Sequence, residues 1–252
     1  MGNKLLPDEI NQLTQFRLGD IPSNSSIILP LEELLIEGNM SVFIEELQLK
    51  INAPDSKVSA SMFAKRYGFF AVLCLFAMTI LDKKLDTSIQ HVSLEMEDKD
   101  QVWLPKFIFS KMVGISPNQG KREEWRDQII KAIFADHIHM IIESLYKETK
   151  ISKLILWENI AIYIFWLYEN VLADPKFEDK KERIEEDFHY IVEKANGHLF
   201  GPFNHNPITR FYTGKPVKHH IQNEVRIRTT CCYFYKTTEN NDRCNTCPLN
   251  CK

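Results

Sequence analysis

The chain has 252 residues, of which 44% are hydrophobic and 26% are charged, and its formal net charge is −3. A chain of this length can bury a core without covalent cross-links, so its six cysteines are not needed to hold an undersized fold together. The small net charge excludes a strong general attraction to nucleic acid or to an anionic membrane surface. We therefore expect no nucleic-acid partner and at most a peripheral membrane contact.

The N-terminus and the apolar segments predict a soluble, cytoplasmic protein. The first residues lack the basic start and the long apolar stretch of a signal peptide. The longest uncharged apolar run covers residues 69–81, whereas a membrane-spanning helix needs about 20 residues. In a reducing compartment, clustered cysteines are more often metal ligands or redox groups than structural disulfides.

The first third of the chain predicts three helices. Pro30 is expected to open a short helix that Gly38 closes, and Ser41 is expected to cap a second helix that ends near residue 51. Ser56 begins a long helix, at about residues 57–82. The second half of this helix is apolar nearly all round, so it should lie inside the protein.

Just before that apolar half, the long helix combines hydroxyl groups with two cations. Lys65 and Arg66 are adjacent, and Ser59 and Ser61 precede them. Taken alone, the pattern favours a solvated helix face, because long cationic side chains reach water along the surface of a helix.

A β-hairpin is predicted next. Residues 91–97 and 101–109 alternate in hydrophobicity on either side of a polar turn. Pro105 lacks an N–H group for the ladder, so the second strand should lie at a sheet edge.

The segment 122–149 has the periodicity of one long helix. It carries His137 and His139, but side chains two positions apart on a helix point to different faces. These histidines are therefore expected to be structural rather than a metal-binding pair.

Two further helices are predicted before residue 200. The segment 152–172 is aromatic and apolar, which predicts a buried helix, although Glu158 and Asn159 interrupt it. The segment 176–195 is a charged amphipathic helix, and Gly197 is expected to terminate it in the C′ position.

After residue 200 the chain becomes rich in glycine and proline, and residues 205–236 are basic. The sequence thus predicts an α+β fold with two parts. Residues 1–200 form a mainly helical substrate-binding body with one small antiparallel hairpin, and residues 201–252 form an irregular C-terminal segment packed on it.

Five of the six cysteines lie in the last 22 residues, at positions 231, 232, 244, 247 and 251. A C-x-x-C turn such as Cys244–Cys247 suits zinc or iron. Cys231 and Cys232 would point to opposite faces of an extended strand, so both can bind metal only if the backbone bends there. From spacing alone, an iron–sulfur cluster is favoured over zinc, and disulfide chemistry comes third.

The arrangement Arg226-x-Arg228-Thr-Thr-Cys231-Cys232-Tyr-Phe-Tyr, followed by Cys244-Asn-Thr-Cys247-Pro-Leu, resembles the C-terminal signature of the FhuF-like ferric siderophore reductases. Segments around Asn206-Pro207 and residues 59–67 also resemble this family, which is related to the helical module of siderophore synthetases. Eleven residues separate Cys232 from Cys244, one more than the family spacing, and the loop between them can absorb the difference.

The resemblance implies a [2Fe–2S] cluster on Cys231, Cys232, Cys244 and Cys247. Cys251 is an extra thiol, which we expect to be a free cysteine near the end of the chain; the alternative is that it replaces one of the four as a ligand. It also implies one-electron reduction of Fe(III) held by a siderophore of the hydroxamate or citrate type, with an electron donor that the sequence does not identify. Two alternatives remain: a siderophore-binding protein without reductase activity, and a structural zinc module.

Cations near the cluster would attract anionic ferric complexes and favour the reduced cluster. Arg226 and Arg228 are the strongest candidates because they lie within five residues of Cys231. Lys65 and Arg66 are the weaker pair of predicted substrate-binding residues. Cys74 lies in the apolar run and is expected in the core.

Overall fold

The structure is a computed structural model that describes residues 2–19, 26–97, 103–215 and 226–251. It confirms the mainly helical α+β class. The helices are α1 (Pro7–Thr14), α2 (Asn39–Lys50), α3 (Ser56–Thr79), α4 (Arg122–Ile133), α5 (His139–Thr149), α6 (Lys153–Trp166) and α7 (Lys181–His189). The strands are β1 (Asn3–Lys4), β2 (Ser26–Pro30), β3 (Lys84–Leu85), β4 (Val92–Glu97), β5 (Lys106–Phe109) and β6 (Val113–Ile115).

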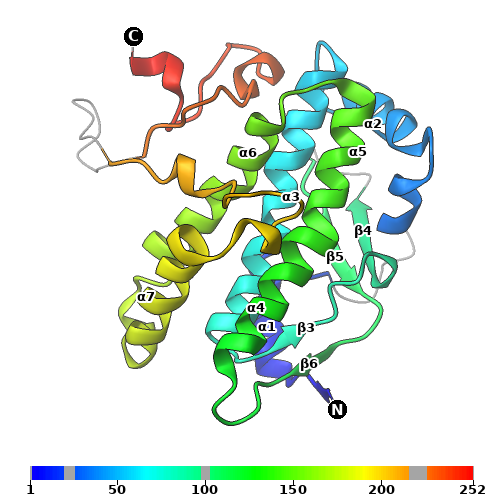
Figure 1. Ribbon diagram of the computed structural model, residues 1–252. Helices are drawn as coiled ribbons and strands as arrows, with labels where there is room; N and C mark the ends of the chain where they lie inside the picture. The colour runs from blue at the N-terminus through cyan, green and yellow to red at the C-terminus, as the bar shows by residue number, and fades with distance from the viewer. Residues whose placement is uncertain (1, 20–25, 98–102, 216–225, 252) are drawn as a thin grey trace.

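Helix α3 is the centre of the fold (Figure 1). Asp55 caps it by accepting a hydrogen bond of 2.9 Å from the backbone N–H of Val58. By length and composition α3 could cross a membrane, but most of it is buried inside the protein. Gly68 lets α6 approach closely, because a Cβ atom at this position would lie 2.8 Å from Cδ2 of Tyr163.

The predicted hairpin forms, with β4 and β5 paired antiparallel, and β5 is an edge strand. The second strand is shorter than predicted, since it begins at Lys106, after Pro105. The predicted turn lies outside the described residues. Strand β2 pairs with the other edge of β4, which the sequence did not predict. Leu94 and Phe107 are fully buried, and Phe107 packs on Phe70 of α3.

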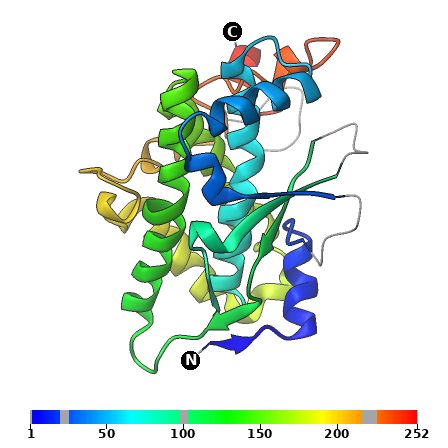
Figure 2. The same ribbon diagram turned by 90° about the vertical axis from the view of Figure 1, so that its right-hand side faces the viewer.

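A second small sheet has the order β1-β6-β3 and closes the end of the molecule near the N-terminus. Figure 2 shows the sheet of β2, β4 and β5 on the opposite side of α3 from α4 and α5. The C-terminal segment lies at the other end, over the upper ends of α3 and α6 (Figures 1 and 2).

The predicted helix 122–149 is present as α4 and α5, joined by a π-helical turn over Phe134–Ile138. The turn places His137 in the core, where one ring nitrogen lies 2.5 Å from the Tyr67 hydroxyl and the other 2.6 Å from the Thr87 carbonyl. His137 is therefore structural, as predicted. Cys74 is buried, also as predicted.

Two predicted helix ends are wrong. Helix α2 begins at Asn39, because Gly38 adopts a left-handed conformation (φ 86°) just before it, so Ser41 is not the cap. Gly197 is not a C′ residue, since the helical segment ends at Lys194 and Ala195 is extended. Gly197 is required for space instead: a Cβ atom would lie 2.4 Å from the Phe203 carbonyl oxygen.

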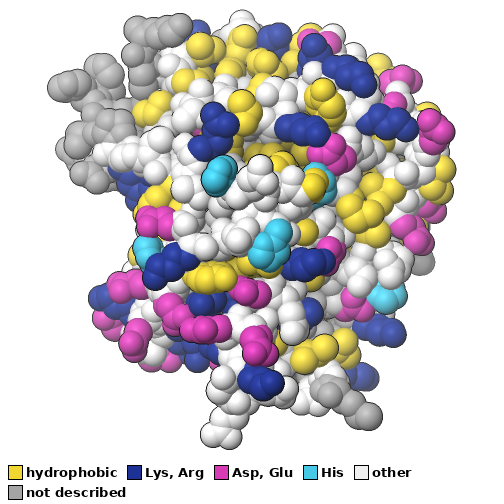
Figure 3. All heavy atoms as spheres, viewed as in Figure 1, with side chains coloured by type: hydrophobic (Ala, Val, Ile, Leu, Met, Phe, Trp, Pro, Cys, Tyr) yellow, Lys and Arg dark blue, Asp and Glu magenta, His cyan; other side chains and the backbone are white. Residues whose placement is uncertain are grey.

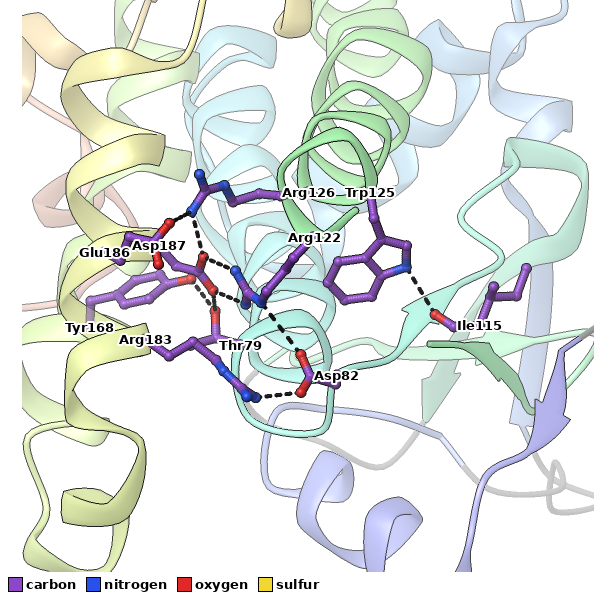
Figure 4. Close-up of polar contacts among 10 residues, drawn as sticks. All are labelled: Thr79, Asp82, Ile115, Arg122, Trp125, Arg126, Tyr168, Arg183, Glu186 and Asp187. Carbon is purple, nitrogen blue, oxygen red and sulfur yellow. Dashed lines mark hydrogen bonds and ion pairs between the residues drawn. The ribbon is translucent and has the colours of Figure 1, made fainter. Parts of the chain in front are cut away.

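A buried polar network joins α3, α4 and α7 at the end of the molecule away from the cysteines (Figure 4). Asp187 is fully buried and accepts two hydrogen bonds of 2.7 Å from Arg122. It also accepts hydrogen bonds from Arg126 and Thr79, at 3.0 Å each. The network fixes the position of α7 against the two helices.

Candidate functional site

The backbone bends at the adjacent cysteines, as binding by both requires. Tyr233 adopts a left-handed conformation (φ 61°), and a 3-10 helix follows it over Phe234–Thr237. The bend allows the Tyr233 N–H to donate to Sγ of Cys231 at 3.4 Å. Cys232 is buried, whereas Cys231 is partly exposed.

The second pair of cysteines forms a tight turn. The N–H of Cys247 donates to the carbonyl oxygen of Cys244 at 3.0 Å, and a 3-10 helix begins at Pro248. Cys247 is buried, and Cys244 is partly exposed. The side chain of Cys251 lies outside the described residues.

The structure brings sulfur atoms from the two pairs together. Sγ of Cys232 lies 3.9 Å from Sγ of Cys244. Two sulfur ligands on one tetrahedral metal, each bound at about 2.3 Å, are about 3.8 Å apart, so this pair fits two ligands of a single metal ion. Among the described residues, no three His, Cys, Asp or Glu side chains are arranged as one metal-binding group.

The local charges favour a thiolate at this pair. The hydrogen bond from Cys232, together with the charges of Lys65 and Arg228, lowers the pKa of Cys244 to about 6. The same hydrogen bond raises the pKa of Cys232, because it stabilises the Cys232 thiol. Thiolates are the metal-binding form of cysteine, so the site is suited to metal or to a cluster.

Glu158 holds the segment that precedes the cysteines. One of its carboxylate oxygens accepts from the Thr229 N–H at 2.6 Å, and the other from the Thr230 N–H at 2.8 Å. The hydroxyl groups of both threonines also donate to the same carboxylate. These bonds explain why an acidic residue lies in a buried helix.

Asn159 and Ser61 complete this attachment. Asn159 donates to Ser61 and accepts a hydrogen bond of 2.6 Å from the side chain of Arg228. The Ser61 hydroxyl donates to the carbonyl oxygen of Cys232 at 2.7 Å. The backbone N–H of Arg228 donates to the Thr246 carbonyl at 2.9 Å, which links the two cysteine-bearing stretches. We call Ser61, Glu158, Asn159 and Arg228 the polar clamp.

The clamp corrects the prediction of a solvated face around residues 59–67. Ser59 and Ser61 are fully buried, because α2 and the cysteine segment cover this side of α3. The sequence pattern alone did not show what would cover it. The two polar residues inside an apolar helix, Glu158 and Asn159, were the available signal.

A pocket of about 290 Å³ lies directly beside the cysteines. Cys244 itself contributes to its wall, and α6 with the π-helical turn after it contributes half of the other lining residues. The lining residues are Lys65, Ile162, Tyr163, Phe165, Trp166, Glu169, Asn170, Lys215, Arg226, Arg228, Cys244, Asn245 and Thr246.

Three of the four predicted cations line this pocket. Arg226 is ion-paired with Glu169 at 2.6 Å, and Arg228 is buried in the clamp. Lys65 lies 4.5 Å from the centre of the Phe234 ring. Arg66 is not among the lining residues: its guanidinium donates to the Met62 carbonyl, and burial lowers its pKa.

The pocket also contains residues that the sequence did not assign to a site, including aromatic residues of α6 that were expected in the core. Glu169 pairs with Lys215 at 2.9 Å as well as with Arg226. Tyr163 and Trp166 supply aromatic surface. No local sequence motif marks these positions. The pocket forms only when the C-terminal segment folds over α6, so its lining residues are far apart in the sequence.

Comparison with known protein families gives two matches. A family described as "Ferric iron reductase FhuF-like transporter" matches residues 61–198, more than half of the chain. The "FhuF 2Fe-2S C-terminal domain" matches residues 228–249, which contain all four predicted ligands and exclude Cys251. No curated protein matches the chain.

These matches confirm the resemblance and the cofactor. The second family is defined by a 2Fe–2S centre, so the cofactor is a [2Fe–2S] cluster, and the cysteine-rich segment is the part of the chain that holds it. The helical body and the cysteine segment together place the chain in the FhuF-like ferric iron reductase family.

Proposed function

We propose that the protein reduces siderophore-bound Fe(III) to Fe(II) by one electron and thereby releases iron in the cytoplasm. The observation that carries the proposal is that Cys244, a predicted cluster ligand, forms part of the pocket wall. A ferric complex in this pocket would lie next to the cluster. Its ligand would be of the hydroxamate or citrate type.

The charge of the pocket suits an anionic ferric complex. Four cations and one carboxylate line it, and Glu169 is already shared between Lys215 and Arg226. Lys65 has no carboxylate partner among the described residues, so its ammonium group is available to ligand oxygens. Acidic side chains gather over α7, at the lower left of Figure 3, away from the end that carries the cysteine segment.

The size and the aromatic walls indicate how a complex would bind. Ligand pockets that enclose a drug-sized molecule range from about 300 to 1,000 Å³. A pocket of about 290 Å³ would therefore hold one chelating arm of a siderophore rather than the whole complex. Tyr163, Phe165 and Trp166 would pack on the organic part of that arm.

The chemistry follows from the preferences of iron. Hard oxygen ligands bind Fe(III) in preference to Fe(II), so a gained electron loosens the complex. A bound cluster would supply that electron, and a separate donor would then have to reduce the cluster again. Lys65 and Arg228 place positive charge near Cys232 and Cys244, which favours the more negative, reduced state of the centre.

An anaerobic mixing experiment tests this function. The dithionite-reduced protein, freed of excess reductant, is mixed with a ferric hydroxamate or ferric citrate in the presence of an Fe(II) chelator. We expect the visible spectrum of the oxidised cluster to return while Fe(II) is trapped. Binding of the complex without either change would show a siderophore-binding protein that is not a reductase.

The variants Cys244→Ser and Cys251→Ser provide a matched pair. Cys244→Ser should lose or alter the cluster spectrum and the transfer of electrons. Cys251→Ser should retain both, because Cys251 is predicted not to be a ligand. Equal loss in the two variants would contradict the ligand set.

A further inference from the structure

A contact between two sulfur atoms suggests how the four predicted ligands are divided between the two irons. Neighbours in sequence would be the simplest partners on one iron: Cys231 with Cys232, and Cys244 with Cys247. The contact between sulfur atoms that the structure shows joins Cys232 with Cys244, at 3.9 Å. That separation matches two ligands of one tetrahedral metal, which are about 3.8 Å apart.

The backbone supports this crossed arrangement. The Ser61 hydroxyl fixes the Cys232 carbonyl, and the Arg228 N–H fixes the Thr246 carbonyl between Cys244 and Cys247. These contacts hold the two cysteine-bearing stretches side by side, so that one thiol from each can meet.

We propose that Cys232 and Cys244 bind one iron of the cluster and that Cys231 and Cys247 bind the other. A [2Fe–2S] cluster has two cysteine ligands on each iron, so assigning the first pair assigns the second.

The two irons would then have different surroundings. Cys244 lines the pocket together with Lys65, so the iron of Cys232 and Cys244 is the one that faces the substrate pocket. Cys231 accepts the Tyr233 N–H, and Cys247 is buried away from the pocket lining. In reduced [2Fe–2S] clusters the added electron usually resides on one iron. The charge of Lys65 favours the pocket-facing iron, which one electron from dithionite would convert from Fe(III) to Fe(II).

Mössbauer spectroscopy of ⁵⁷Fe-labelled protein tests the pairing without any siderophore, so its outcome is independent of the proposed function. Each ligand is replaced in turn by serine, whose oxygen can still bind iron. In the dithionite-reduced protein, Cys232→Ser and Cys244→Ser should both alter the ferrous signal. Cys231→Ser and Cys247→Ser should both alter the ferric signal. Alteration of the same iron by Cys231→Ser and Cys232→Ser would overturn the proposal.

A second measurement avoids variants that fail to assemble the cluster. In the unmodified reduced protein, paramagnetic ¹H NMR separates the cysteine β-protons by the temperature dependence of their shifts, which differs between the ferric and ferrous sites. We expect the assigned β-protons of Cys232 and Cys244 to show ferrous-site behaviour, and those of Cys231 and Cys247 ferric-site behaviour. A different grouping of the four cysteines would contradict the crossed pairing. If Cys231 and Cys247 instead show the ferrous-site behaviour, the pairing holds but the electron resides on the other iron.

Discussion

At the scale of single residues, Glu158 does the most to position the cysteines. Its carboxylate accepts hydrogen bonds from the N–H and hydroxyl groups of Thr229 and Thr230. In Glu158→Gln, an amide NH2 group replaces one carboxylate oxygen. This group is a hydrogen-bond donor, and it would face N–H and hydroxyl groups that also donate. We expect the cluster to be lost to a chelator roughly 30-fold faster, the equivalent of about 2 kcal/mol.

The measurement is the decay of visible absorbance in excess chelator. Glu45→Gln is the control, because Glu45 is exposed on α2. Equal decay rates in the two variants would show that the clamp does not hold the cluster.

Lys65 should tune the reduction potential of the cluster. Lys65→Met retains an unbranched side chain of similar length but removes the positive charge beside Cys232 and Cys244. We expect the potential to fall by about 60 mV, which is a tenfold change in a one-electron equilibrium. An EPR-monitored redox titration measures it, with the exposed Lys57→Met on the same helix as control. An unchanged reduction potential would show that the charge of Lys65 lies too far from the cluster to influence it.

His137 should make the fold sensitive to acid. Burial lowers its pKa from 6.5 to about 4. Between these values the unfolded chain binds a proton that the folded protein does not, so stability is lost as the pH falls from about 6.5 to 4. Over this range the free energy of unfolding falls by about 3 kcal/mol.

Urea unfolding at several pH values measures this effect. In His137→Gln, the free energy of unfolding should fall by about 3 kcal/mol less between pH 6.5 and pH 4 than in the unmodified protein. The variant itself is expected to be less stable at pH 7. Identical pH profiles for the two proteins would exclude the role of His137.

At the scale of elements, Asp187 joins α7 to α3 and α4 (Figure 4). Removing a buried charge leaves its partners unpaired, so Asp187→Ala should lower the free energy of unfolding by about 3–5 kcal/mol. Chemical denaturation measures this, with the exposed Glu185→Ala as control. The folded variant should still bind the cluster, because the network lies at the other end of the protein. Stability within 1 kcal/mol of the control would contradict the structural role.

The sequence predicted the long elements well and the short ones poorly. Helix α3 and helix α6 were predicted from long apolar stretches and the 122–149 helix from its periodicity, and each signal extends over several turns, which single positions cannot obscure. Strands β1 and β3 have two residues each and contain no periodicity to detect. Gly197 was assigned to a helix end because its real constraint, the nearby Phe203 carbonyl, is visible only in three dimensions.

The site was predictable where its chemistry is local. The cysteine pattern identified the cluster segment without a structure, because ligand spacing is a property of the chain itself. The partners of that segment could not be found in this way. Glu158 lies about 70 positions before the threonines that it holds, and Ser61 is 171 positions from Cys232.

At the scale of the whole molecule, the cysteine segment is attached to a body that has its own large core. The core residues come almost entirely from positions before 212, whereas the cysteine segment is held mainly by the polar clamp. Removal of the cluster should therefore loosen the segment and leave the helical body folded.

Limited proteolysis before and after chelation checks this expectation. We expect new cleavage within residues 229–251 only in the cluster-free protein, with little change in far-UV circular dichroism. Loss of helical signal together with the cluster would show that the two parts fold as one unit.

In the proposed function, the cluster beside the pocket passes one electron to a bound ferric complex. Single-turnover stopped-flow mixing of the reduced protein with ferric siderophore tests it most directly. We expect one Fe(II) to be trapped for each cluster reoxidised, and we expect Lys65→Met to slow the transfer while Lys57→Met does not. A reduced cluster that persists in the presence of bound ferric siderophore would contradict it.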